Sequence, residues 1–202
     1  MTEEDFSRIM GLGHELSGVE FKSPGPMSNR RLVAQVIRAI LGMCNRRDGG
    51  TVIIGVEDAQ GVLNPVGLTE PDLSEWSYDA LADQIARYAD PSASFAVDVR
   101  EYDGNSYVVI EVEEFSDIPV LCKRSYGDVL QDGACYVRPR RKPETSSIPT
   151  QADMRDLLDL AIEKGVTRFL ERARRVGLFY IPTAESQVTD WERFDEQLGD
   201  LR

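Results

Sequence analysis

The sequence predicts an α/β domain, a mixed sheet of about six strands flanked by helices, within a chain of 202 residues. Apolar residues repeat at spacings of three and four over residues 32–44 and 154–162, which predicts two helices. Short β-branched runs lie between these segments and predict strands. An Asp-Gly pair separates two such runs, which is typical of a hairpin. A sheet of this kind buries its faces under helices, so the two patterns together indicate the α/β class.

The first elements are a short helix and a strand. Thr2 caps the helix, which we expect to end near Gly11. Polar and apolar residues alternate over residues 17–22, which predicts a strand before the Pro- and Gly-rich breaker at residues 23–26.

The second helix has the strongest apolar pattern in the chain. Ser28 or Asn29 caps it, and the stripe over residues 32–44 leaves its arginines on the polar side. A glycine pair then leads into a β-branched run, which predicts one buried strand over residues 51–57.

The remaining elements follow the same alternation. They are a helix over residues 78–89, hairpin strands over residues 95–102 and 107–113, short strands over residues 120–123 and 135–138, and a helix that begins at Thr150. The apolar spacing resumes after Gly165. We therefore divide the chain into a domain over residues 1–163 and a helical extension with an acidic tail over residues 164–202.

The composition is that of a soluble globular protein, with 42% hydrophobic and 29% charged residues. Apolar stretches fall far short of the ~18 residues that a membrane span requires. The acidic N-terminus lacks the pattern of a secretory signal, so we expect a cytoplasmic protein without membrane contact. Three scattered cysteines without metal-ligand spacing predict reduced packing residues and no zinc site.

The net charge of −12 argues against indiscriminate binding to a polyanion. The two ends of the chain are strongly acidic, with −4 in residues 1–20 and −4 in residues 184–202. The basic residues cluster between them, which predicts a local nucleic-acid-binding surface, although such runs are more often solvated edges. The predicted nucleic-acid-binding residues are Arg30, Arg31, Arg38, Arg46, Arg47, Lys123, Arg138, Arg140, Arg141 and Lys142.

Three acids and a lysine lie near the ends of two predicted strands. Glu15 and Glu20 flank the start of the first strand, Lys22 shares a strand face with Glu20, and Asp58 follows the later strand. Carboxylates hold Mg²⁺ or Mn²⁺ and a lysine neutralises phosphate, so these residues suit a metal-dependent phosphodiesterase. Solvated glutamates and a turn-capping aspartate explain the same spacing, which does not decide between the two interpretations.

The sequence resembles the Schlafen-type divergent Alba-like domain, a family of nucleic-acid-binding proteins. The resemblance covers roughly residues 5–163. Its most specific parts are His-Glu-Leu-Ser-Gly-Val-Glu-Phe-Lys at residues 14–22 and Gly-Gly-Thr-Val-Ile-Ile-Gly-Val-Glu-Asp at residues 49–58. Later segments also agree: Ile-Pro-Val at residues 118–120, Tyr-Val-Arg at residues 136–138, and the Ser/Thr-rich residues 145–147.

The resemblance implies an active site as well as a fold. In ribonuclease members of the family, an acidic pair five residues apart and an acid after the Gly-Gly strand form the site, and Glu15, Glu20 and Asp58 match these positions. The implied function is a Mg²⁺- or Mn²⁺-dependent endoribonuclease that acts on structured RNA such as tRNA. The three acids would hold the metal and Lys22 would steady the scissile phosphate. The alternative is a non-catalytic DNA-binding or protein-interaction module with a regulatory role.

Two departures from the family pattern bear on cofactor and assembly. The glycine pair lacks the spaced glycine and lysine of a Walker A loop, so we expect no ATP. The vertebrate nucleases have two lobes and a structural zinc site, whereas this chain has one lobe without zinc spacing. A homodimer would supply the second lobe and cover surplus apolar residues, although a tail folded onto its own domain would also cover them. These residues are Val166, Phe169, Leu170, Phe179, Tyr180, Trp191 and Phe194.

Overall fold

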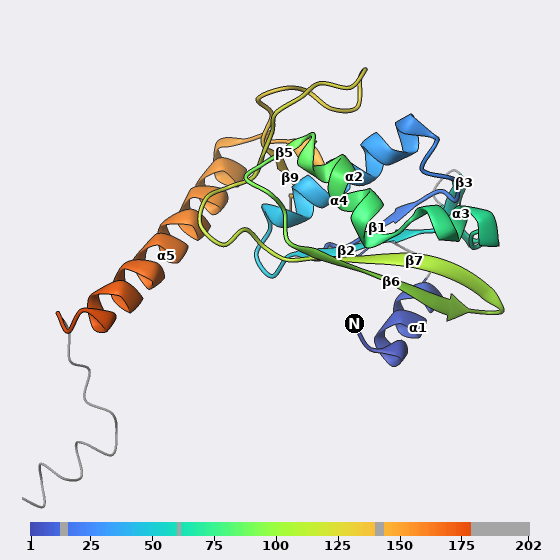
Figure 1. Ribbon diagram of the computed structural model, residues 1–202, viewed down its shortest axis with the longest axis horizontal. Helices are drawn as coiled ribbons and strands as arrows, with labels where there is room; N and C mark the ends of the chain where they lie inside the picture. Colours follow the sequence, from blue (N-terminus) through green and yellow to red (C-terminus); the bar gives the residue numbers. More distant parts are fainter. Residues whose placement is uncertain (13–15, 60–61, 140–143, 179–202) are drawn as a thin grey trace, which may run out of the picture. The chain divides into compact units, whose positions relative to one another are not determined.

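The principal sheet of the protein has four strands in the order β1-β2-β7-β6 (Figure 1). A computed structural model describes residues 1–12, 16–59, 62–139 and 144–178. The parallel pair β1 and β2 and the antiparallel neighbours on the other side make the sheet mixed, which confirms the predicted α/β class. The strands are β1 Val19–Lys22, β2 Gly50–Ile54, β6 Phe95–Tyr102 and β7 Asn105–Val112.

Within the described residues, three two-stranded sheets accompany the principal sheet. The predicted count of about six strands is therefore approximate. The short strands expected near residues 120–123 and 135–138 exist, but each pairs with a different partner. The small sheets join β3 Val56–Ala59 to β4 Val62–Pro65, β5 Ala89–Asp90 to β8 Leu121–Cys122, and β9 Tyr136–Val137 to β10 Ser146–Ser147.

Gly55 breaks the strand that the sequence predicts over residues 51–57. Its φ is +120°, a conformation that L side chains rarely adopt, and an added Cβ would lie 2.8 Å from the ring of Tyr107. The backbone N–H of Gly55 donates to the carbonyl of Lys22 at 2.9 Å and closes the parallel pair. Beyond Gly55 the chain leaves the principal sheet and forms the β3–β4 hairpin, so the prediction of one continuous strand was wrong.

The helices follow the predicted pattern with three differences. Helix α4 ends three residues early because the chain enters β5, α3 was not predicted, and α5 continues through Gly165 without a break. Asn29 caps α2, where its side chain accepts from the N–H of Leu32 at 3.2 Å. The helices are α1 Glu3–Gly11, α2 Arg30–Cys44, α3 Glu70–Glu75, α4 Tyr78–Ala86 and α5 Gln151–Arg175.

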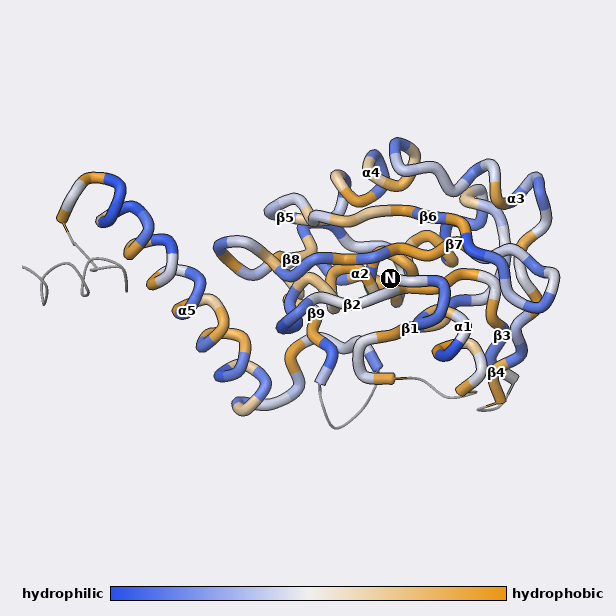
Figure 2. Tube along the Cα trace, turned by 90° about the horizontal axis from the view of Figure 1, so that it is seen from below, coloured by the Kyte–Doolittle hydropathy of each residue, from blue (hydrophilic) through white to orange (hydrophobic). Residues whose placement is uncertain are grey.

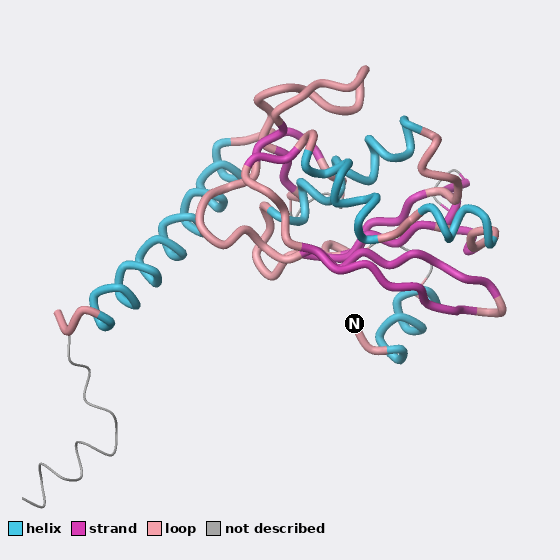
Figure 3. The backbone as a smooth tube through the Cα atoms, viewed as in Figure 1, coloured by secondary structure: helices cyan, strands magenta, loops and turns pink. Residues whose placement is uncertain are grey.

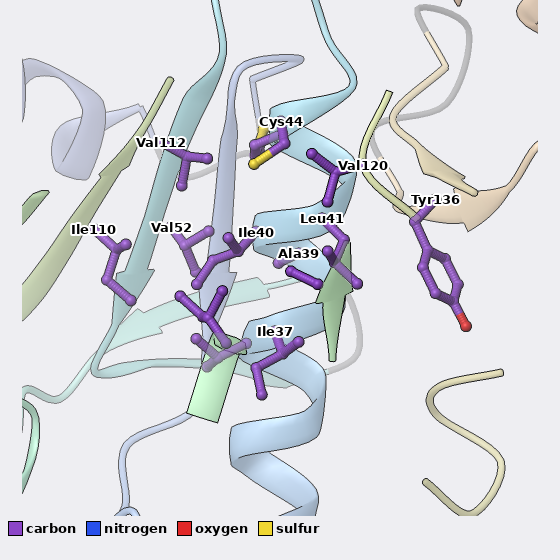
Figure 4. Packing of buried hydrophobic residues seen from close by; sticks show 14 of the residues in the cluster. Ile37, Ala39, Ile40, Leu41, Cys44, Val52, Ile110, Val112, Val120 and Tyr136 are labelled. Carbon is purple, nitrogen blue, oxygen red and sulfur yellow. The ribbon is translucent and has the colours of Figure 1, made fainter. Parts of the chain in front are cut away.

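Helix α1 covers one face of the principal sheet, and α2 and α4 cover the other (Figures 1 and 3). Eleven of the fifteen residues of α2 are buried, because the helix packs against the sheet on one side and against β9 and α4 on others. Figure 2 shows the apolar colour of this central region. Figure 4 shows the contact at close range, with side chains of α2 packed near Val52, Ile110, Val112, Val120 and Tyr136.

The chain divides into two compact units between Ala161 and Ile162, within α5. The first unit contains the sheets, α1 to α4 and the start of α5, where Leu157 and Leu160 join the core. None of the helices in the described part of the chain combines the length and the apolar character of a membrane span.

Candidate functional site

The candidate site lies on β1, at the edge of the principal sheet. In the parallel register Glu20 lies beside Val52 and Lys22 beside Ile54, two residues of the core under α2. Val19 and Phe21 belong to the core under α1. Because side chains alternate along a strand, Glu20 and Lys22 share one face, as the sequence predicted, and the structure shows that this is the face under α2.

Glu20 is buried, with 8% of its surface exposed, and its carboxylate accepts from three side chains. Oε1 forms an ion pair with the ammonium of Lys22. Oε2 accepts from Nη1 of Arg138 at 2.6 Å and from the hydroxyl of Thr145 at 2.6 Å. The carboxylate is therefore neutralised by two cations within the protein.

The guanidinium of Arg138 binds the outer edge of β1. Its side chain is 0% exposed, Nε donates to the carbonyl of Ser17 at 2.9 Å, and Nη2 donates to the carbonyl of Val19 at 2.6 Å. Arg138 was predicted to contact nucleic acid. Its burial and these bonds give it a structural position in this conformation, because the guanidinium has no surface to offer a phosphate.

Thr145 extends the network to α2. The residue is 3% exposed, and its carbonyl accepts from Nη2 of Arg38 at 2.7 Å. Arg38 also lies over the ring of Tyr136, 5.4 Å from its centroid. Gly42 of α2 makes room for Thr145, since an added Cβ would lie 2.5 Å from the threonine methyl group. Thr145 thus contacts both Glu20 of β1 and Arg38 of α2.

The other predicted acids are less closely tied to Glu20. Glu15 lies outside the described residues. Asp58 is exposed on β3, opposite Leu63, in a strand pair separate from the principal sheet. In the sequence, Asp58 follows four residues after Ile54, and Ile54 is the residue that lies beside Lys22. The structure brings Glu20 and Lys22 together and places Asp58 in another sheet.

This geometry does not suit Glu20 as a ligand for Mg²⁺ or Mn²⁺. Both of its oxygens are bonded within the protein, and a divalent cation there would meet the positive charges of Lys22 and Arg138. Among the described residues, no three His, Cys, Asp or Glu side chains are grouped closely enough to hold a metal ion. The ligand set Glu15, Glu20 and Asp58 stays a prediction of the family resemblance.

The basic residues predicted to bind nucleic acid fall into different environments. Arg31 is exposed but forms a two-pronged ion pair with Asp128, with N···O distances of 2.7 and 2.9 Å. Arg46 is half-buried, and its Nη1 donates to the carbonyl of Gly49 at 2.6 Å. The other predicted bases that are exposed are Arg30, Arg47 and Lys123, whereas Arg140, Arg141 and Lys142 lie outside the described residues.

A cavity of about 480 Å³ lies beside the loop that follows α2. Ser17, Arg46 and Arg47 contribute to its wall, and Pro139 lies where the chain enters residues 140–143. The first turns of α5 form another part of the wall and contribute Asp153, Asp156 and Asp159. The cavity thus brings the two arginines of the loop after α2 together with acidic residues of α5, a combination that the sequence analysis did not anticipate.

The cysteines do not provide a reactive nucleophile. Burial raises the pKa of Cys44 to about 12 and that of Cys135 to about 11, so both thiols keep their protons at neutral pH. Burial also raises the pKa of Cys122. All three thiols are free.

These features define an α/β domain in which a buried Arg–Glu pair ties the edge strand to the segment after β9. The chain belongs to the Schlafen AlbA_2 family, whose model matches residues 15–147, and the predicted resemblance is confirmed.

Two solved structures are similar to this chain. One is the DIP2311 protein from Corynebacterium diphtheriae, at 19% identity and a TM-score of 0.45, over 65% of this chain and 22% of that chain. This chain therefore spans about a fifth of the DIP2311 protein. The other is the N-terminal domain of a RecG-related protein from Nitrosomonas europaea, at 21% identity and a TM-score of 0.47, over 65% of this chain and 88% of that chain. A comparison with curated proteins finds no match.

Proposed function

We propose that this domain binds nucleic acid, with structured RNA as the first candidate ligand and DNA as the second, and that it does not cleave it. Membership in the Schlafen AlbA_2 family supports the nucleic-acid part. The main structural support is the cavity that Arg46 and Arg47 line. Arginine groups of this kind bind phosphate oxygens and position a nucleic acid without reading its sequence.

The environment of Glu20 favours binding over metal-dependent cleavage. A ligand for a hard metal ion needs carboxylate oxygens that face the ion. In this protein Lys22, Arg138 and Thr145 occupy those oxygens. The pair Glu20–Arg138 has a sufficient structural role, which explains the acid without a metal.

The charge distribution restricts how a polyanion would lie. Asp156 and Asp159 of α5 also line the cavity and would repel phosphates. We therefore expect contact on the side of Arg47 and away from α5. With a net charge of −12, binding should be weak and should depend on few phosphate contacts.

Fluorescence anisotropy with labelled tRNA, duplex RNA and duplex DNA tests this proposal. We expect binding that weakens with salt, at a logarithmic slope of about −0.7 to −0.9 per phosphate contact. Arg47→Glu should weaken binding at least about tenfold, the effect of ~1.4 kcal/mol. Arg8→Glu, an exposed residue on α1, is the matched control and should bind like wild type. Absence of binding to all three ligands would favour the protein-interaction module instead.

A gel assay tests the cleavage hypothesis separately. tRNA is incubated with the protein in Mg²⁺, in Mn²⁺ and in chelator. We expect intact tRNA under all three conditions. Metal-dependent cleavage that Glu15→Gln and Asp58→Asn both abolish would replace the binding-only proposal with the endoribonuclease.

A further inference from the structure

Helix α5 has an exposed apolar side in addition to the buried leucines near its start. Leu157 and Leu160 are buried, at 5% and 4% exposure. Residues three and four apart along the other side are exposed, which places them in one stripe. This apolar stripe consists of Met154, Leu158, Ile162, Val166, Phe169 and Leu170, exposed by 42–62%.

The stripe is extensive for a surface feature. Single exposed apolar residues are normal, but a contiguous row marks an interaction site. A helix of 25 residues is about 37 Å long, so the stripe follows much of that length. Gly177 and Leu178 close the helix with hydrogen bonds to the carbonyls of Arg174 and Ala173, so the helix ends after the stripe.

The charges of α5 indicate which partner fits the stripe. Residues 151–163 contain four acids against Arg155, a net charge of −3, and residues 164–175 contain five bases against Glu171, a net charge of +4. Acids at the start and bases at the end of a helix interact favourably with the helix dipole, but that effect is confined to the first and last turns. It therefore does not explain the charges of Glu163 and Arg168, which lie in the middle of α5. A second α5 in antiparallel orientation would place each acidic half against a basic half. A parallel one would place like charges together.

The spacing of these charges also defines a register. Asp156 and Arg174 lie at similar angles around the helix, and pairing Asp156 with Arg174 of a second copy centres the two-fold axis on Gly165. Gly165 is exposed, and an added Cβ would meet nothing within 4 Å. A mid-helix glycine costs about 0.5–1 kcal/mol relative to alanine but permits close approach of another backbone. In this register Phe169 lies beside Ile162 of the second copy.

We propose that α5 is a self-association surface on which two copies of the chain pair in antiparallel orientation, through the apolar stripe and around Gly165. The pairing is isologous: where a residue i of one copy contacts a residue j of the second copy, residue j of the first copy contacts residue i of the second. It stands on α5 alone and is independent of the nucleic-acid proposal.

Sedimentation equilibrium of the full chain over about 1–100 µM tests the pairing. We expect a mass that rises from 22.6 kDa toward twice that value with concentration. Phe169→Glu should raise the dimer dissociation constant at least about tenfold. Glu171→Gln, on the side of the helix opposite the stripe, should leave it unchanged, and circular dichroism should show equal helix content in both variants. A monomer at every concentration, as expected if residues 179–202 cover the stripe, would overturn the proposal, and so would an unaffected dimer in Phe169→Glu.

Cysteine cross-linking tests the orientation. Gly165→Cys should form a disulfide-linked dimer upon oxidation, because the two copies meet there. In the antiparallel register the two copies of residue 158 lie about 21 Å apart along the axis, beyond the ~7 Å between Cα atoms that a disulfide tolerates. Leu158→Cys should therefore cross-link no more than wild type, whose Cys44 and Cys122 are buried. Efficient cross-linking of Leu158→Cys, or none of Gly165→Cys, would exclude this orientation.

Discussion

Glu20→Gln should lower the free energy of unfolding by about 3–5 kcal/mol, because it leaves a buried guanidinium without its carboxylate. Arg138 is 0% exposed in its side chain and forms its ion pair with Glu20 at 2.6 Å. The family-based interpretation of Glu20 as a metal ligand predicts the opposite result, a loss of cleavage with the fold intact. One substitution thus separates the two roles.

The magnitude follows from what remains bonded in the variant. Arg138 keeps the carbonyls of Ser17 and Val19 as acceptors, which limits the penalty to the loss of the countercharge. Thr145 loses the charged acceptor of its buried hydroxyl, a change of about 1–3 kcal/mol when the donor stays unsatisfied. The glutamine oxygen can accept one of these bonds, so we expect the lower half of the range. Against a total stability of about 5–15 kcal/mol, the loss is large.

Urea unfolding followed by far-UV circular dichroism measures this change, with the midpoint shifting at constant slope. Glu57→Gln, an exposed glutamate on β3, is the matched control and should stay within about 0.5 kcal/mol of wild type. The double variant Glu20→Leu/Arg138→Met should be less destabilised than the sum of the single variants, because it removes both charges together. If Glu20→Gln unfolds within about 0.5 kcal/mol of wild type, the structural role is refuted.

Two further predictions concern α2. Gly42→Ala should destabilise the protein by about 1–3 kcal/mol, because the added Cβ would lie 2.5 Å from the methyl group of Thr145. This loss should exceed the gain from the better helix propensity of alanine. Adding Thr145→Ser to this variant removes the methyl group and should restore part of the urea midpoint. Stability should also fall as the pH rises above about 9, since an unfolded cysteine loses its proton near pH 9.0 while burial raises the pKa of Cys44 to about 12. Between pH 8 and 10.5 the free energy of unfolding, measured with urea, should fall less steeply for Cys44→Ala than for wild type, by up to about 1.4 kcal/mol per pH unit. An equal slope in both proteins would contradict this.

The sequence predicts most of the local structure and little of the pairing between distant segments. The apolar stripe of α2 and the Asp-Gly hairpin of β6 and β7 are local patterns, and both were predicted correctly. The break at Gly55 was missed because β-branched residues lie on both sides of it, so the pattern reads as one continuous strand. The positive φ of this single residue redirects the chain. The partners of β8 and β9 depend on how the whole chain folds, so the sequence indicated the strand character of these short segments but not the strands with which they pair.

The candidate site shows the same limit. The alternation along β1 correctly places Glu20 and Lys22 on one face. Arg138 and Thr145 lie 118 and 125 residues further along the chain, and no local pattern connects them to Glu20. Arg138 was therefore grouped with its basic neighbours as a nucleic-acid contact. The Tyr-Val-Arg and Ser/Thr-rich segments are part of the family resemblance, so the sequence did single out Arg138 and Thr145. The resemblance does not indicate that both of these residues contact Glu20.

The position of β1 supplies a physical reason for this pair of charges. The carbonyl of Gly18 accepts from Thr51 of β2 at 2.8 Å, and the carbonyl of Lys22 accepts from Gly55, directly after β2, at 2.9 Å. The alternate carbonyls of Ser17 and Val19 therefore point away from the sheet. An edge strand buried under another segment must satisfy such groups, and Arg138 donates to both of them. Its guanidinium thus replaces part of a neighbouring strand, and the charge it brings into the interior requires a buried acid. Glu20 provides that acid from the strand whose edge is being closed, which accounts for the acid, the arginine and the threonine without a bound metal.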